Sequence, residues 1–257
     1  LSRAMEIADE VLGSPTADDT AIGWAASAAA LSSARMGRFD AVDALAEQAL
    51  SAGHPGLLRF TSGFGQTTAL VMTGEPERAL ALARRLADFA QRQQPGRSIG
   101  EVLVADVLIA TGELHDAVTL LRSVATTLAP TGYSWGPLAW MLLAQALGRL
   151  GEPVEAGKAL GRAESRHGLK SMLFAPELAL ARAWTLASRA DTHGAVAAAR
   201  DAIRAAERGA QSAIALRAAA DAVRLGDPRG VETLARLSGE VDCAFGRAAL
   251  SVARDDA

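Results

Sequence analysis

The chain has little of what builds a β-sheet. Aromatic residues make up 4% of its 257 residues, tyrosine occurs once, and alanine and leucine dominate an apolar half. Strong helix formers therefore outweigh the β-branched and aromatic residues that favour strands. The composition predicts an all-α protein.

Charge and cysteine content exclude further classes of protein. The net charge is −3 and no block of like charge occurs, whereas nucleic-acid-binding domains usually carry a basic stripe. We therefore expect no direct nucleic acid binding by this segment. The single cysteine, Cys243, rules out an intramolecular disulfide and fits a reducing compartment, so a cytoplasmic location is expected.

Long apolar runs are also absent. The most apolar stretch, 21–31, is too short to span a bilayer, and longer windows carry charges at helical spacing, so no membrane association is expected. No basic leader or cleavage site is visible. The chain starts at Leu1, and residues 1–12 already have a helical pattern. We therefore expect a fragment of a longer protein.

Catalytic and metal-binding motifs are missing as well. The segment Ser62–Thr68 faintly resembles a phosphate loop, but it lacks the lysine and the glycine spacing, so its glycines are expected to mark close helix contacts. Four histidines occur at turns or helix starts, and none has a metal-ligand partner at helical spacing: His54, His115, His167 and His193. The sequence thus predicts no enzyme, no cofactor and no metal site.

What the chain does have is an internal repeat. A glycine, a few polar residues and a small or apolar residue recur every 36 to 39 positions, and the copies begin at Gly37, Gly74, Gly112, Gly151, Ala190 and Gly226. Glycine accepts the left-handed conformation that ends a helix. Proline and acidic residues follow it, and both suit the first turn of the next helix. Each copy is therefore predicted to be a tight turn between two helices.

A second set of helix breakers falls between these motifs, at 53–55, 95–96, 130–132, 167–168 and 208–209. These segments are predicted to separate one helix pair from the next. The first helices are expected at 18–36, 56–73, 98–111, 134–150, 172–188 and 211–225. The second helices are expected at 39–52, 76–93, 113–129, 152–167, 192–208 and 228–239, with flanking half-repeats at 1–12 and 242–255.

These elements predict one α-solenoid over residues 1–257, with about six helix-turn-helix repeats of roughly 38 residues. A helix pair of this kind cannot bury its apolar stripe alone, so the pairs stack into a superhelix with a concave groove. The architecture is tetratricopeptide-like, although the period exceeds the 34 residues of that repeat and its consensus is absent. A groove of this kind favours binding over catalysis.

The groove has one aromatic cluster, Tyr133, Trp135 and Trp140, at the start of a first helix. These rings could stack on a sugar or a peptide side chain. Alternatively, Trp140 packs inward and the other two cap the previous repeat. Further first-helix residues are candidates for the groove, and each could equally be structural: Phe60, Phe64, Glu101, Glu177 and Arg217, with Trp24, Arg97 and Arg182.

Three strings, Gly136–Ala139, Pro176–Trp184 and Leu216–Pro228, resemble the sensor region of large bacterial LuxR-type regulators of the MalT class. The resemblance covers most of the chain. It implies a nucleotide-switching ATPase module before this superhelix and a helix-turn-helix after it, and neither is present in this sequence. In that class the superhelix receives an inducer, a small sugar in the best-known case, or an inhibitory protein. No binding residue of the family transfers to a position here.

The favoured hypothesis is therefore an effector-sensing domain of a transcriptional regulator, which binds a small molecule such as a sugar or an inhibitory protein. The alternative is a protein–protein interaction scaffold that binds a peptide or a partner helix. A helical enzyme ranks third, because no catalytic constellation stands out. Apolar faces at the two ends of the chain could also cause self-association.

Overall fold

The computed structural model describes residues 1–53, 56–91 and 93–255, and every regular element among them is helical. The first helices of the six pairs are α2 (Asp19–Met36), α4 (Leu58–Thr73), α6 (Gly96–Thr111), α8 (Trp135–Arg149), α10 (Ala175–Ser188) and α12 (Ser212–Arg224). The second helices are α3 (Val42–Ser51), α5 (Pro76–Phe89), α7 (Leu114–Leu128), α9 (Pro153–Arg166), α11 (Thr192–Arg208) and α13 (Gly230–Glu240). Helices α1 (Ser2–Leu12) and α14 (Ala244–Asp255) flank them. The predicted repeat plan is confirmed, and the turn expected at 53–55 lies partly outside the described residues.

The turns within the pairs are alike in detail. The five motif glycines have φ values from 75° to 90°. After each turn a backbone N–H reaches back five residues, as in the bond that Glu75 donates to the carbonyl of Leu70 over 2.8 Å. The motif that begins at Ala190 makes the same bond, from Asp191 to Leu186, with Ala190 itself at φ 61°. This pairing satisfies carbonyls that the helix end would otherwise leave open.

The start of α10 differs from the sequence-based expectation of residue 172. A short 3-10 helix, η3 (Leu169–Phe174), comes first, and α10 begins at Ala175. The Ser171 hydroxyl accepts a hydrogen bond from the Gly168 N–H over 3.1 Å, which stabilises the tighter turn. Pro176 then lies in the first turn of α10, where its missing N–H leaves no helical bond unmade.

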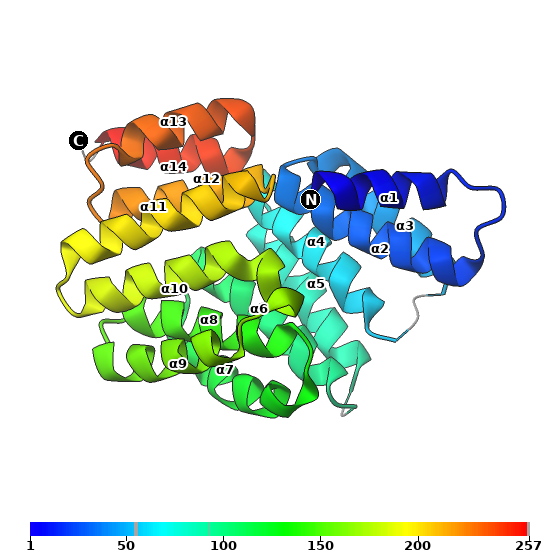
Figure 1. The fold of residues 1–257 in the computed structure, drawn as a ribbon, viewed down its shortest axis with the longest axis horizontal. Coiled ribbons are helices and arrows are strands. Elements are labelled where there is room, and N and C mark those ends of the chain that lie inside the picture. The colour runs from blue at the N-terminus through cyan, green and yellow to red at the C-terminus, as the bar shows by residue number, and fades with distance from the viewer. Residues whose placement is uncertain (54–55, 92, 256–257) are drawn as a thin grey trace.

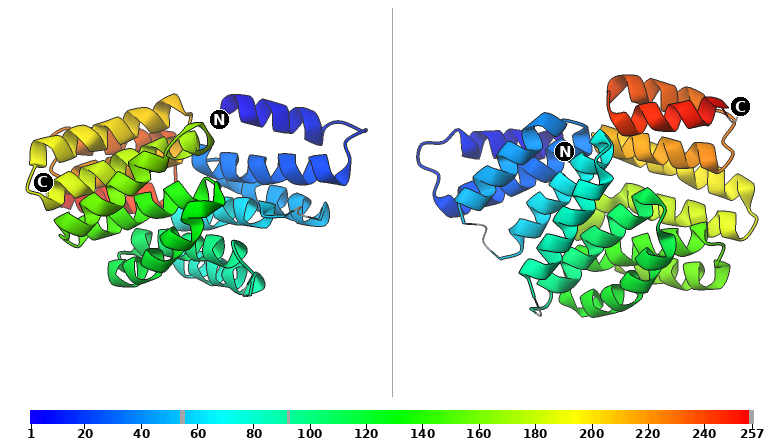
Figure 2. Two further views of the ribbon diagram at one scale, coloured as in Figure 1. Left: turned by 60° about the horizontal axis from the view of Figure 1, so that its bottom comes forward. Right: turned by 180° about the vertical axis from the view of Figure 1, so that it is seen from behind.

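The first helices form an inner layer and the second helices an outer one (Figures 1 and 2). Nearly every residue of α8 is buried, whereas α9 buries only Ala156, Ala159 and Ala163 along one stripe. Close packing of the inner layer depends on glycine: a side chain at Gly65 would lie 2.7 Å from the carbonyl oxygen of Ala30 in α2. The glycines of the Ser62–Thr68 segment therefore mark a close helix contact, as predicted.

The superhelix curls until its two ends meet. Helix α12 packs on α2, and α14 packs on α4, so elements at opposite ends of the chain lie side by side (Figure 1). The approach is close, because a side chain at Gly37 would lie 2.8 Å from Val241. The sequence predicted a concave groove but not its width, because sequence periodicity does not specify superhelical pitch. In the structure the inner helices contact one another across the axis, as in the ion pair between Arg217 of α12 and Asp106 of α6, and they leave a narrow cleft.

Two apolar cores lie on either side of this cleft. The leucine-aromatic core lies mainly in α4 to α9 and contains Leu103, Leu121, Trp135 and Leu138. The alanine-rich core lies mainly in α11 to α14 and consists mainly of buried alanines such as Ala199, Ala202, Ala215, Ala218 and Ala219. Helix α10 supplies residues to both. In the described part of the chain, no helix is long and apolar enough to cross a membrane.

Candidate functional site

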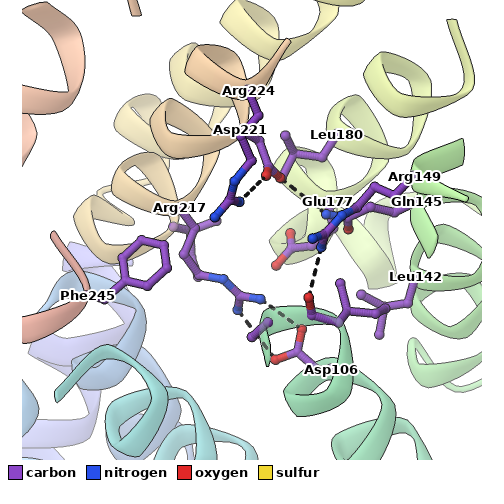
Figure 3. A pocket seen from close by; sticks show the side chains of 13 residues that line it. Asp106, Leu142, Gln145, Arg149, Glu177, Leu180, Arg217, Asp221, Arg224 and Phe245 are labelled. Carbon is purple, nitrogen blue, oxygen red and sulfur yellow. Dashed lines mark hydrogen bonds and ion pairs between the residues drawn. The ribbon is translucent and has the colours of Figure 1, made fainter. Parts of the chain in front are cut away.

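The central cleft lies where four inner helices converge. Its charged lining comes from α6, α8, α10 and α12, and Phe245 of α14 stands at one side (Figure 3). The charged residues are Asp106, Arg149, Glu177, Arg217, Asp221 and Arg224. The cavity volume is about 40 Å³, which is room for a few water molecules. The cleft in this conformation therefore accepts a single small polar group and not a whole sugar ring.

Arg217 and Asp106 form an ion pair across the cleft, from α12 to α6. The guanidinium Nη1 and Nη2 atoms lie 3.4 and 3.3 Å from the two carboxylate oxygens (Figure 3). Asp106 is 4% exposed. Burial by itself would lower the pKa of Arg217, but the charge and hydrogen bonding of Asp106 outweigh it, and the pKa is raised. Arg217 therefore stays charged inside the superhelix.

A second carboxylate of the cleft, Asp221, lies one turn further along α12. It accepts a hydrogen bond from Nη1 of Arg224 over 2.9 Å and one from the Gln145 amide of α8 over 3.3 Å (Figure 3). These contacts join α8 to α12, two helices that are separated by more than sixty residues of sequence. Asp221 is thus neutralised by an arginine of its own helix.

The third carboxylate, Glu177, pairs with Arg35 of α2. Arg35 is 1% exposed, and its Nη2 donates to Glu177 Oε1 over 2.7 Å while its Nε donates to the Gln211 side chain over 2.7 Å. The other oxygen of Glu177, Oε2, is buried and has no hydrogen-bond partner among the described residues. Arg35 therefore fixes Glu177 at the cleft and ties the first repeat to the last two.

Arg149 differs from the other arginines of the cleft. Its Nη1 donates to the backbone carbonyl of Ile109 over 2.8 Å, and its guanidinium lies 5.6 Å from the centre of the Trp184 ring. No carboxylate of the described residues forms an ion pair with it. Burial lowers the pKa of Arg149, the charge of Asp221 counters this in part, and Arg224 and Arg217 add to the lowering. Because a guanidinium does not deprotonate in proteins, Arg149 stays a cation without a carboxylate partner.

This arrangement can bind and orient charged groups. No cluster of three or more histidine, cysteine or acidic side chains suited to a metal ion occurs among the described residues. The three described histidines, His115, His167 and His193, lie on three different outer segments, and His54 is outside the described residues. Cys243 is buried, and burial raises the pKa of its thiol, so it is a weak nucleophile. The absence of an enzymatic activity stays a prediction.

Most of the aromatic residues predicted to line a groove lie in the leucine-aromatic core. Phe64, Trp135 and Phe174 form a buried trio, with ring centres 5.6 to 6.4 Å apart. Phe60 is 4% exposed, and Trp140 is buried beneath the guanidinium of Arg162, 4.6 Å from its ring centre. For Trp140 this is the inward packing that the sequence left open as the alternative.

The remaining predicted residues are scattered over the molecule. Tyr133 is 49% exposed and lines a pocket of about 350 Å³ with Arg166, Lys170 and Ser171. Glu101 accepts a hydrogen bond from Arg97 over 2.8 Å, in a pocket between α5, α6 and α7. Glu177 and Arg217 reach the central cleft. Trp24 is exposed on α2, and Arg182 pairs with Glu164 of α9 on the surface. The predicted set therefore does not form one site.

The sequence interpretation missed Arg35, Asp106, Arg149 and Asp221. One local signal pointed to Asp106, because it is the only charge in the apolar run 102–110 of α6. A charge in such a run must be paired or must face a polar cavity. Arg35 and Arg149 lie at the ends of inner helices, where a basic residue is also expected from the helix dipole, so they carried no comparable signal.

Comparisons with known proteins agree with this fold. No protein-family model matches the chain, and no curated protein matches its sequence. A Rap protein complexed with Competence and Sporulation Factor matches with a TM-score of 0.63 and 14% identity, over 99% of this chain and 71% of its own length. Two structures of a Podosopora anserina putative kinesin light chain with TPR-like repeats have TM-scores of 0.42 and 0.43 at 17% identity, over 77% of this chain and 93% and 94% of their own. At this identity the Rap match shows the fold alone: the chain is a tetratricopeptide-like α-solenoid.

Proposed function

We propose that this chain is a partner-binding regulatory superhelix, and that the central cleft receives part of a protein or peptide partner. The observation that carries the proposal is the convergence of charged side chains from four inner helices on one interior cleft, where one partly buried cation, Arg149, has no carboxylate partner among the described residues (Figure 3). Charges buried in this way are costly, and an apolar interior of the same volume would stabilise the fold as well or better. Binding is a reason for their presence that folding alone does not supply.

The fold supports this reading. The Rap protein that shares it was solved in complex with Competence and Sporulation Factor, so a solenoid of this plan accommodates a bound partner. Stacked helix pairs bind partners through their inner helices because these helices line the axis of the superhelix. In this chain the inner helices meet, so we expect binding to widen the cleft by a small change in superhelical pitch.

A small-molecule effector is the second proposed function. The central cleft, at about 40 Å³, falls well short of the several hundred Å³ that small-molecule pockets occupy. The Tyr133 pocket, at about 350 Å³, offers a half-exposed ring for stacking together with Arg166 and Lys170. A sugar effector is therefore assigned to the Tyr133 pocket. A role within a cytoplasmic LuxR-type regulator of the MalT class belongs to the same proposal.

Thermal unfolding of the purified chain tests both functions. The ligands are pools of random tri- to pentapeptides in one arm and a panel of mono- and disaccharides in the other. A ligand present at a hundred times its dissociation constant stabilises by about 2.7 kcal/mol, which raises the melting temperature measurably. We expect a shift with the peptide pools. A shift with a sugar alone would favour the Tyr133 pocket, and no shift in either arm would contradict binding of short peptides.

A pair of variants locates the peptide site. Ala110 lines the central cleft, and Ala110→Phe would fill it without altering a charge. Ala197 is exposed on the outer helix α11, so Ala197→Phe adds the same ring elsewhere. We expect the peptide-induced shift to disappear in the first variant and to persist in the second. A shift retained by both folded variants would place the binding site outside the central cleft.

A further inference from the structure

We infer that the central cleft binds a carboxylate group, and that Arg149 is its receptor. The inference rests on the proposed partner-binding function and specifies which chemical group of the partner enters the cleft. The inference is based on the position of Arg149 beside three carboxylate–arginine pairs (Figure 3). Because each carboxylate of the cleft is paired with another arginine, Arg149 is the one charge of the cleft without a charged partner among the described residues.

The charges of the cleft pair one to one. The three carboxylates each have an arginine of their own: Asp106 has Arg217, Glu177 has Arg35, and Asp221 has Arg224. Arg149 is the fourth arginine, and no described carboxylate forms an ion pair with it. Counted together with Arg35, the charged residues of the cleft therefore carry an excess of one positive charge, which a single anionic group would neutralise.

Arg149 is held in position by the fold and not by a charge partner. Gly148 lets α8 approach α10 closely, since a side chain there would lie 2.6 Å from the backbone of Trp184. The Arg149 guanidinium then lies against the Trp184 ring and donates to the Ile109 carbonyl. A guanidinium has five N–H donors in a planar fork, so donors remain for a carboxylate in the two-bond geometry that arginine prefers.

The volume of the cleft also favours a carboxylate group. A volume of about 40 Å³ admits a few water molecules, and a carboxylate is of that size. The buried Oε2 of Glu177 lines the same cleft without a hydrogen-bond partner. The Glu177 Oε2 would repel an anion but would accept a hydrogen bond from an N–H group. The ligand's carboxylate is therefore expected at Arg149, and an N–H donor of the same ligand at Glu177. The carboxyl terminus of a peptide, with its adjacent backbone N–H, provides both groups.

The test compares matched ligands. Each peptide pool is prepared as the free acid and as the C-terminal amide, and acetate and succinate are tested alone as small carboxylates. We expect the free acids to raise the melting temperature and the amides to do so much less. Binding by acetate or succinate as strongly as by peptides would assign the site to a small organic acid. If neither peptide pool binds, the proposed function fails; equal binding by both pools would overturn the carboxylate inference alone.

Variants of Arg149 provide the second readout. One charge-assisted interaction corresponds to about a tenfold to hundredfold change in affinity, so we expect a loss of that size for Arg149→Gln with a free-acid peptide. The amide form should bind both proteins alike. Arg149→Lys should recover part of the loss, because lysine keeps the charge but not the two-bond geometry. Arg122→Gln, at an exposed position of α7, is the matched control and should bind as the parent does. A loss equal for acid and amide would show that Arg149 serves only the fold.

Discussion

The two cores on either side of the cleft follow the same repeat plan with different side chains. The leucine-aromatic core fills the space between its helices with Leu103, Leu138, Trp135 and similar residues, each of which buries a large apolar area. The alanine-rich core buries little area per residue, and its small side chains leave little room for added atoms between the helices. The first core should therefore be sensitive to lost volume, and the second to added volume and to the quality of its turns.

The largest expected effect is loss of volume in the leucine-aromatic core. Trp135→Ala removes the ring that contacts Phe64 and Phe174, and we expect a loss of about 3 to 5 kcal/mol in the free energy of unfolding, measured by urea titration. Tyr133→Ala, two residues away and half-exposed, is the control and should change stability by less than about 0.5 kcal/mol. Similar losses for the two variants would contradict the assignment of Trp135 to the core.

Added volume should harm the alanine-rich core more. Ala219 is fully buried in α12, and Ala219→Leu forces its neighbours apart, at a cost of about 1 to 3 kcal/mol in the free energy of unfolding. The same change at the exposed Ala197 of α11 should be nearly neutral. A neutral Ala219→Leu would mean that the alanine helices are loosely packed, which would remove the difference between the cores.

A turn of the alanine-rich core offers a gain in stability. Ala190 occupies the left-handed conformation that glycine adopts in the other five motif turns. Ala190→Gly removes the steric cost of that conformation, and we expect a gain of about 0.5 to 1 kcal/mol, read from the midpoint of urea unfolding. The reverse change at an equivalent position, Gly226→Ala, should lower the midpoint. A lower midpoint for Ala190→Gly would show that flexibility of the unfolded chain outweighs the relief of strain.

The smallest expected effect is acid sensitivity at Asp227, in the turn between α12 and α13. The hydrogen bond from Arg200 lowers the pKa of Asp227, burial opposes it, and the backbone N–H of Arg229 lowers it further. A carboxyl whose pKa is lowered in the folded state stabilises the fold at pH values above its ordinary pKa of about 3.9. This contribution is lost as the pH falls through the lowered pKa. The melting temperature is measured at neutral and at acidic pH. The drop between the two should be smaller for Asp227→Asn than for the parent. An equal drop for the two proteins would show that the Arg200–Asp227 ion pair does not contribute to acid sensitivity.

The sequence predicted the local structure well, because helix ends depend on local chemistry. Glycine, proline and acidic residues placed the turns to within a few residues, and even the copy at Ala190 could be recognised from its spacing. The site could not be predicted in the same way. Arg217 and Asp106 are 111 positions apart, and they meet only because the superhelix curls by a particular amount. Aromatic residues such as Trp135 could not be assigned from the sequence, because a ring at the start of a helix can face a groove or pack on the previous repeat.

The contact between the first and last repeats has a consequence for how the array folds. An open solenoid gains stability from nearest neighbours only, so it can unravel from either end. Arg35 instead bonds to Glu177 and Gln211, which lie 142 and 176 positions further along the chain. Such distant pairs form only after most of the chain is ordered, so they make folding slower and more cooperative. They also fix the number of repeats: one extra unit between α2 and α10 would carry Arg35 out of reach of its partners, so this array cannot lengthen by simple duplication.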